Sequence, residues 1–233
     1  MNQIALKLKP REYQVEESFK ALRANLQFCG EDKKVIALTS CTPNEGKSTV
    51  SLQLALSLAE SGKKTVLIDA DMRKSVLVGF TKPSQHGLRG LAHYLSGQNT
   101  LQDVIYMTDI QNLYIVYSGP FPPNPAELLG GKQFKGMLQA LRKVYDYVII
   151  DTPPLGSVID GAIVAGSCDG AILVIESGVI SYRFAQNVKD QLERSNCPVL
   201  GAVLNKVDMQ KSGYGKYYGK YYGNYGETGG AKK

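Results

Sequence analysis

The sequence lacks several features that would point to common classes of protein. Among its 233 residues it has no tryptophan, two histidines and only four cysteines. The cysteines are far apart and form no C-x-x-C pair, which argues against a zinc site or a dithiol redox site and favours free thiols in a reducing cytosol. The amino-terminal residues lack the hydrophobic core of a signal peptide, and Asp169 and glycines interrupt the apolar stretch from 163 to 175. No membrane-spanning segment is predicted.

The formal net charge of +6 is concentrated at the carboxyl terminus. Residues 211–233 hold five lysines and one glutamate, a net charge of +4, so the remainder of the chain carries only +2. This distribution does not indicate a wholly basic nucleic-acid-binding domain. The same segment consists almost entirely of Gly, Tyr and Lys, which cannot form a packed core, so we expect residues 211–233 to be a disordered tail.

The region from 31 to 210 alternates short apolar runs with longer helical patterns, which is typical of a parallel sheet built from β-α-β units. The sequence therefore predicts one α/β domain with a doubly wound, mainly parallel sheet. An amphipathic helix over residues 14–28 precedes this domain, within a separate segment 1–30. The predicted strands lie at 35–40, 65–69, 113–117, 147–151, 171–175 and 199–205, and the predicted helices at 48–60, 126–144 and 181–195.

The strongest chemical motif is S-C-T-P-N-E-G-K-S-T at residues 40–49, between a predicted strand and a predicted helix. It is nearly a Walker A loop, whose backbone N–H groups surround nucleotide phosphates, and it predicts a P-loop NTPase-like fold. Lys47 would pair with the β- and γ-phosphates and Ser48 would ligate Mg²⁺. The alternative is a chance helix-capping turn. The predicted nucleotide contacts are Thr42, Pro43, Asn44, Glu45, Gly46, Lys47, Ser48 and Thr49.

Cys41 occupies the position of the first glycine in the Walker A pattern. We interpret it as a small residue that fits the loop. The alternative is a reactive thiol whose pKa the helix N-terminus lowers.

Carboxylates end two further predicted strands. V-L-I-D-A-D-M-R places Asp69 and Asp71 at the end of one strand, and Y-V-I-I-D-T-P-P places Asp151 at the end of another. The carboxyl ends of parallel strands meet at one edge of a sheet, where ligands bind. An aspartate in this position often only caps the next helix. Together with Lys47, however, these residues predict a site for phosphoryl transfer.

The stretch N-K-V-D at 205–208 follows the last predicted strand, and its spacing reads guanine in other P-loop proteins. A simple turn is the alternative, because Asn tolerates sharp bends. We predict that Asn205 contacts the edge of the base.

These motifs and the tyrosine cluster that follows them resemble the bacterial tyrosine kinases of capsule and exopolysaccharide synthesis, the CpsD-like family, over residues 16–225. The resemblance implies a protein-tyrosine kinase that uses ATP and Mg²⁺. It implies that Asp69 accepts the tyrosine proton and that Asp71 and Asp151 organise the metal with Ser48. It further implies autophosphorylation in trans of the tail tyrosines, Tyr214, Tyr217, Tyr218, Tyr221, Tyr222 and Tyr225.

The resemblance also implies a homo-oligomeric ring. The family's oligomerisation helix carries a Glu followed at three-residue intervals by two Arg, and Glu17, Lys20 and Arg23 match this pattern with one Lys in place of Arg. Lys lacks the bidentate fork of Arg. A membrane-anchored activator, a cognate tyrosine phosphatase and other protein substrates are implied as partners. The expected location is the cytoplasm, at the inner face of the membrane through the activator.

Two other functions remain open from the residues. A switch ATPase of the partition and division-site type would share the P-loop, but those proteins carry a lysine five residues before the Walker lysine, where this chain has Thr42. A nucleic-acid binder would use the Lys/Tyr tail for stacking and charge. That tail has no folded platform, so no nucleic-acid partner is predicted.

Overall fold

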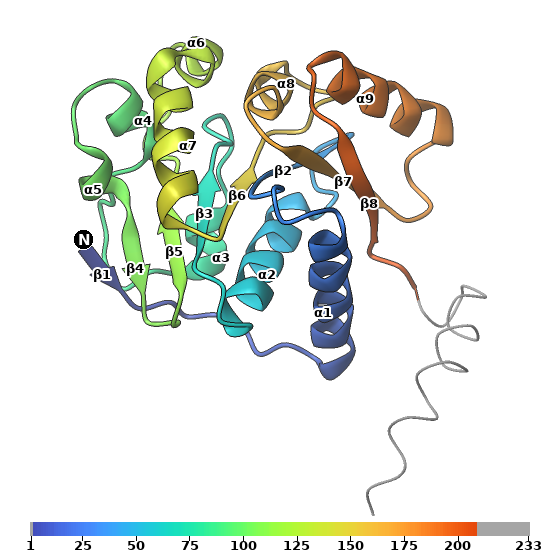
Figure 1. Ribbon diagram of the computed structural model, residues 1–233, viewed down its shortest axis with the longest axis horizontal. Helices are drawn as coiled ribbons and strands as arrows, with labels where there is room; N and C mark the ends of the chain where they lie inside the picture. The colour runs from blue at the N-terminus through green and yellow to red at the C-terminus, as the bar shows by residue number, and fades with distance from the viewer. Residues whose placement is uncertain (1, 209–233) are drawn as a thin grey trace, which may run out of the picture.

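The computed structural model describes residues 2–208, and the predicted disordered tail lies outside them. A single twisted sheet runs through the described part (Figure 1), with strands in the order β1-β4-β5-β3-β6-β2-β7-β8. Neighbouring strands are parallel except β4 and β5. The strands are β1 (Asn2–Ile4), β2 (Val35–Ser40), β3 (Thr65–Asp69), β4 (Tyr106–Thr108), β5 (Leu113–Val116), β6 (Tyr147–Asp151), β7 (Gly170–Glu176) and β8 (Val199–Asn205).

Helices cover both faces of the sheet, which confirms the predicted doubly wound α/β fold (Figure 1). Helices α1, α2 and α3 pack on the face of the sheet that carries Ile36, Leu67 and Ile149. The other helices cover the opposite face. The helices are α1 (Tyr13–Phe28), α2 (Lys47–Glu60), α3 (Leu77–Thr81), α4 (Leu91–Leu95), α5 (Leu101–Val104), α6 (Pro125–Gly130), α7 (Lys132–Val144), α8 (Asp160–Ala165) and α9 (Tyr182–Arg194).

The central strands β2, β3 and β6 consist of buried residues throughout, because a strand covered on both faces must be apolar on both. The chain leaves these strands at the same edge, hereafter the carboxyl edge. The Walker A motif, Asp69 and Asp151 all lie there because their strands are neighbours and parallel. The sheet thus brings together motifs that are about a hundred residues apart in sequence.

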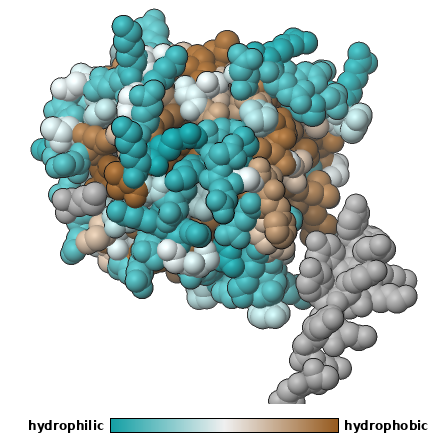
Figure 2. All heavy atoms as spheres, viewed as in Figure 1, coloured by the Kyte–Doolittle hydropathy of each residue, from teal (hydrophilic) through white to brown (hydrophobic). Residues whose placement is uncertain are grey.

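The structure differs from the predicted elements in several places, and strand β4 and the short helices α3, α4, α5 and α8 were not predicted. The helix predicted over 126–144 is two helices, because Gly131 has an extended backbone with ψ of 162°. Residues 2–4 form a strand of the same sheet, which the sequence did not reveal. Strand β8 lies at the sheet edge and exposes part of its surface, with Leu204 half-exposed. Figure 2 shows hydrophobic residues gathered over this region of the viewed face.

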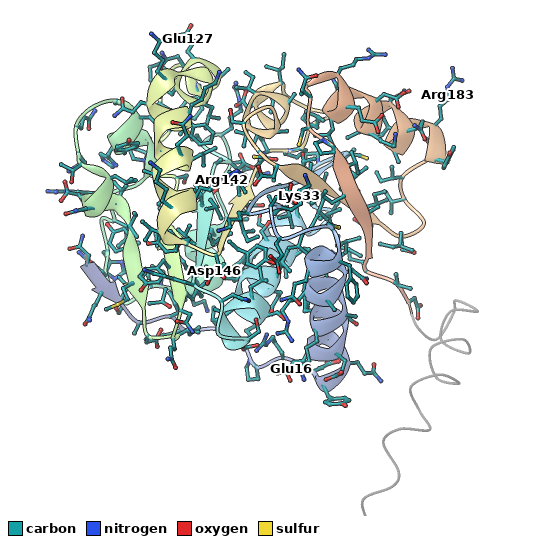
Figure 3. The ribbon with its side chains drawn as sticks, in the orientation of Figure 1. Glu16, Lys33, Glu127, Arg142, Asp146 and Arg183 are labelled. Atoms are coloured by element: carbon teal, nitrogen blue, oxygen red, sulfur yellow. The ribbon has the colours of Figure 1, made fainter. Side chains whose placement is uncertain are left out.

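The strands begin at the opposite edge of the sheet, hereafter the amino edge. A second set of charged residues stabilises this edge. Asp169 accepts hydrogen bonds from the backbone N–H groups of Lys34 and Val35, at 2.9 and 2.8 Å, and forms an ion pair with Arg142 from α7. Asp146 accepts a bond from the N–H of Lys64 at 2.7 Å. Figure 3 shows Arg142 close to the loop that precedes β2.

Within residues 2–208, no helix is both long and apolar enough to cross a lipid bilayer.

Candidate functional site

The Walker A segment forms a tight loop between β2 and α2. Gly46 is the N-cap of α2 and has a left-handed backbone, with φ of 88°, and Asn44 has φ of 69°. A side chain at position 46 would bring its Cβ to 2.2 Å from Nδ2 of Asn205. No side chain caps the N-terminus of α2. The loop therefore directs free backbone N–H groups toward the carboxyl edge, as a phosphate site requires.

Glu45 braces this loop through its side chain. The carboxylate is buried and accepts hydrogen bonds from the N–H and hydroxyl groups of Thr42 on one oxygen. Its other oxygen accepts a bond at 2.9 Å from the N–H of Glu176, at the end of β7. The side chain of Glu45 thus holds the loop against the sheet.

Asn205 and Lys206 clamp the same loop from the end of β8. Nδ2 of Asn205 donates to the carbonyl of Glu45 at 2.8 Å, and Nζ of Lys206 donates to the carbonyl of Asn44 at 2.6 Å. Lys206 also pairs with Glu176 at 2.9 Å. The sequence singled out the N-K-V-D stretch that contains Asn205 and Lys206, but it did not indicate these contacts. Part of the N-K-V-D stretch therefore has a structural use that does not involve a base.

Lys47 is the centre of a buried charge cluster. Its Nζ lies 2.7 Å from Oδ1 of Asp151, 3.1 Å from Oγ of Ser48 and 4.0 Å from Oδ2 of Asp71. Ser51, one turn further along α2, donates to the same oxygen of Asp151 at 2.9 Å. The structure therefore brings together four of the residues predicted for the site, and Ser51 is a contact that the sequence did not reveal.

Asp69 is completely buried beside this cluster. Its Oδ1 accepts a hydrogen bond from the N–H of Asp71 at 3.1 Å, and its Oδ2 accepts one from the hydroxyl of Ser75 at 2.5 Å. Burial and, to a smaller extent, the nearby charge of Asp151 raise the pKa of Asp69 to about 7, although Ser75 and Lys47 oppose the shift. A carboxyl with this pKa can exchange protons near neutral pH.

Cys41 is fully buried at the start of the loop. Burial raises the pKa of its thiol to about 11, and the charge of Glu45 acts in the same direction. The idea of an activated thiol is therefore wrong, and Cys41 is the small residue that fits the loop.

Arg73 connects the two acidic motifs. Its guanidinium group donates two hydrogen bonds to the buried carboxylate of Asp160, at 2.7 and 3.1 Å. Asp160 lies at the start of α8, nine residues beyond Asp151. The pair fixes the segment after β3 against the segment after β6. The sequence contained the arginine, but its partner is distant in the chain and no local pattern indicates it.

The remaining predicted residues lie apart from the charge cluster. Pro43, Asn44 and Thr49 are exposed on the loop and the first turn of α2. On α1, Lys20 pairs with Glu17 at 2.7 Å, and a guanidinium nitrogen of Arg23 donates to the carbonyl of Ser57 on α2 at 2.6 Å. The six predicted phosphorylation sites, Tyr214 to Tyr225, lie outside the described residues.

The donor set fits a magnesium nucleotide. Mg²⁺ prefers oxygen ligands and is usually held by one or two carboxylates together with phosphate oxygens and water. Ser48, Asp71 and Asp151 supply such oxygens next to the loop. Among residues 2–208, no group of three His, Cys, Asp or Glu side chains is arranged to hold a metal by itself. A Mg²⁺ ion held by these oxygens would take its other ligands from phosphate oxygens and water.

Comparison with known proteins places this site in a family. Residues 33–193 match the family model described as an AAA domain. The tyrosine-protein kinase CpsD of Streptococcus agalactiae is 47% identical over 202 residues, which cover 87% of this chain and 88% of that protein. The kinase domain of the Escherichia coli tyrosine kinase ETK superposes with a TM-score of 0.78 at 32% identity, covering 82% of this chain and 75% of that domain.

A septum site-determining protein is a more distant match. The septum site-determining protein MinD from Pyrococcus horikoshii OT3, solved with Mg-ADP, has a TM-score of 0.64 and 25% identity, and the match covers 75% of this chain and 71% of MinD. The identity to the tyrosine kinases is higher, and the coverage of the CpsD protein is more complete. The chain therefore belongs to the family of bacterial protein-tyrosine kinases that includes the CpsD proteins.

Proposed function

We propose that this chain transfers the γ-phosphate of ATP to tyrosine residues, beginning with its own tail, and that it regulates capsular or exopolysaccharide synthesis. The observation that carries the proposal is the buried cluster of Lys47, Asp69, Asp71 and Asp151 beside an uncapped helix N-terminus. The family supports the same activity, because its curated members include CpsD and the tyrosine-protein kinase YwqD of Bacillus subtilis.

The residues of the site have different roles in phosphoryl transfer. The loop N–H groups and Lys47 bind and neutralise the phosphates, and Lys47 exchanges its present contact with Asp151 for a phosphate oxygen. Ser48, Asp71 and Asp151 would hold Mg²⁺, which would supply positive charge next to the phosphates. In this scheme Asn205 supports the loop through the carbonyl of Glu45 and also contacts the edge of the base.

Asp69 acts as the general base. Its carboxylate removes the proton from the tyrosine hydroxyl as the phenolic oxygen bonds to the γ-phosphorus, and the bond from that phosphorus to the ADP oxygen breaks. A base with a pKa of about 7 suits this role, because enough carboxylate is present at neutral pH and it still binds the proton well. The hydrogen bond from Ser75 orients the carboxylate.

The proposed ring rests on α1 and on the family. Glu17 and Lys20 form an exposed pair on the helix surface, where a neighbouring subunit can reach them. Arg23 is half-buried and bonds to Ser57 through one guanidinium nitrogen, so a ring contact would use its other nitrogens. A membrane-anchored activator, a cognate tyrosine phosphatase and further protein substrates remain proposed partners, and recruitment to the inner face of the membrane is proposed to occur through the activator.

The test of the activity uses the full chain with γ-labelled ATP and Mg²⁺, followed by hydrolysis and separation of phosphoamino acids. We expect labelled phosphotyrosine, and loss of most label when Phe replaces all six tail tyrosines. ATP hydrolysis with no phosphotyrosine would instead assign the site to a switch ATPase. If the six-Phe variant labels as strongly as the natural chain, the acceptor is not the tail.

A further inference from the structure

A groove of about 710 Å³ opens beside the proposed base. Its walls come from residues 75–88, which follow β3, from residues 117–119, which follow β5, and from Lys7. Ser75 belongs to both places, since it lines the groove and donates to Asp69 at 2.5 Å. Strand β3 separates β5 from β6 in the sheet. The groove therefore lies on the side of Asp69 opposite to the Walker A loop.

The lining of the groove is cationic and partly apolar. Its positive charge comes from Lys7 and Lys82, no Asp or Glu lines it, and apolar surface comes from Val78, Pro83 and Leu88. The sequence around it has the same bias: residues 72–102 contain four Lys or Arg and both of the chain's histidines, but no Asp or Glu. A ligand that carries an aromatic ring and a negative group complements this combination.

Hydrogen bonds hold the walls of the groove in place. The hydroxyl groups of Thr81 and Tyr117 lie 2.9 Å apart, and both residues are buried. The N–H of Lys7 donates to the carbonyl of Thr81 at 2.9 Å, and Ala5 exchanges two bonds with Ser84. A ligand therefore meets walls that are already ordered, which reduces the entropy lost on binding.

The charge of the tail determines which form the groove attracts. The unmodified tail carries +4 and is repelled by a cationic lining. Each phosphotyrosine adds about −1.5 to −2 at pH 7 and pairs readily with lysine. The tail tyrosines Tyr217, Tyr221 and Tyr225 are four residues apart. An extended chain covers about 13 Å over four residues. When one of these tyrosines is bound in the groove, the next one therefore lies just outside the groove.

We propose that this groove binds a phosphotyrosine of a tail that has already been phosphorylated once, and that it thereby presents a neighbouring tyrosine to Asp69. The proposal rests on the proposed kinase activity and deepens it. The first phosphorylation of a tail is then slow, because the cationic groove does not favour the substrate. Later ones are faster, because the product of one transfer becomes the anchor for the next.

The experiment compares three fluorescent peptides with the sequence of residues 211–228: unmodified, phosphorylated on Tyr221, or with Glu at that position. The protein is the full chain with Phe in place of its six tail tyrosines, so that its own tail does not react. Binding is measured by fluorescence anisotropy without ATP, and phosphate transfer is measured with ATP and Mg²⁺. The groove variant is Lys7→Gln with Lys82→Gln, and the control is Lys135→Gln, an exposed lysine of α7 on the opposite face.

We expect the phosphorylated peptide to bind at least tenfold more tightly than the unmodified one and to gain its second phosphate faster. Removing both groove lysines should weaken its binding about tenfold, since each exposed ion pair contributes modestly, while the control variant should bind normally. Three results would overturn the proposal. The unmodified peptide or the Glu peptide could bind as tightly as the phosphorylated one, or Lys135→Gln could weaken binding as much as the groove variant does. If no peptide becomes phosphorylated, the kinase assignment fails, and the binding data alone still decide the groove.

Discussion

At the carboxyl edge of the sheet, Asp69 is surrounded by other carboxylates and its pKa rises to about 7, chiefly through burial. At the amino edge, burial also opposes ionisation of Asp169, but the hydrogen bonds from Arg142 and from the N–H groups of Val35 and Lys34 outweigh it, and the net pKa is lowered. The difference lies in the partners. An aspartate that is satisfied by backbone N–H groups and an arginine is fixed as an anion and holds the fold.

The two aspartates affect stability in opposite ways as pH changes. Asp69 binds its proton more tightly in the folded state, so its contribution to stability is present below the unfolded pKa of about 4 and is lost as pH rises through about 7. Asp169 has a lowered folded pKa, so its contribution is present above about 4 and is lost as pH falls through the folded value. A protein commonly sacrifices stability at a reactive site and recovers it elsewhere.

The largest expected effect follows from Lys47→Met at the carboxyl edge. We expect tail phosphorylation to fall by at least about a thousandfold, because the cation that neutralises the phosphates is removed. The variant should also lose about 3 kcal/mol of stability, since buried Asp151 loses its cation. Radiolabel transfer and urea unfolding measure the two effects.

A double variant separates the chemical from the structural role of Lys47. Adding Asp151→Asn to Lys47→Met removes the buried unpaired charge, so stability should return while activity does not. Recovery of labelling in the double variant would show that Lys47 acts only by holding the fold.

The second prediction concerns the pH dependence of kcat/KM for tail phosphorylation, which reports groups of the free enzyme. Because Asp69 must be ionised to accept a proton, the rate constant should rise with pH and level off above about 7, with a tenfold loss for each pH unit well below it. Rates between pH 5 and 8.5 in buffers of constant ionic strength provide the measurement. A flat profile across this range would contradict the assignment of Asp69 as a base with a raised pKa.

The smallest expected effect is at the amino edge. Arg142→Ala should lower the free energy of unfolding by about 1 kcal/mol, a modest value because the arginine is 40% exposed and solvent screens its pair with Asp169. Kinase activity should stay within a factor of two. Lys143→Ala, at the exposed neighbouring position, is the matched control and should change neither quantity. A large loss of activity in Arg142→Ala would mean that the two edges are coupled.

The sequence predicted those parts of the protein whose signal is local. Apolar runs such as residues 35–40 and 147–151 predicted the buried strands. The glycine, lysine and serine of the Walker A motif predicted the position of the phosphate-binding loop. Because the carboxyl ends of parallel strands lie at one edge of a sheet, it was predictable that Asp69 and Asp151 would lie near Lys47. The break at Gly131 was missed because apolar periodicity continues on both sides of it.

Other contacts could not be predicted because they join residues that no motif links. Arg73 with Asp160 and Lys206 with the carbonyl of Asn44 are separated by many residues, and each pair forms only once the sheet is assembled. The groove likewise depends on how residues 75–88 pack beside the end of β5. The pKa of Asp69 follows from its complete burial, and composition carries no information about burial at a single position.

The most direct test of this account substitutes one aspartate at each edge, Asp69→Asn and Asp169→Asn, and measures activity and stability for both. Asp69→Asn should lower kcat/KM by more than tenfold and leave the free energy of unfolding at neutral pH unchanged or higher, because a buried carboxylate is replaced by a neutral amide. Asp169→Asn should leave kcat/KM within a factor of two and lower stability by about 2 kcal/mol. If Asp69→Asn keeps more than a tenth of the activity, or if Asp169→Asn loses activity without losing stability, the proposed division between the two edges is contradicted.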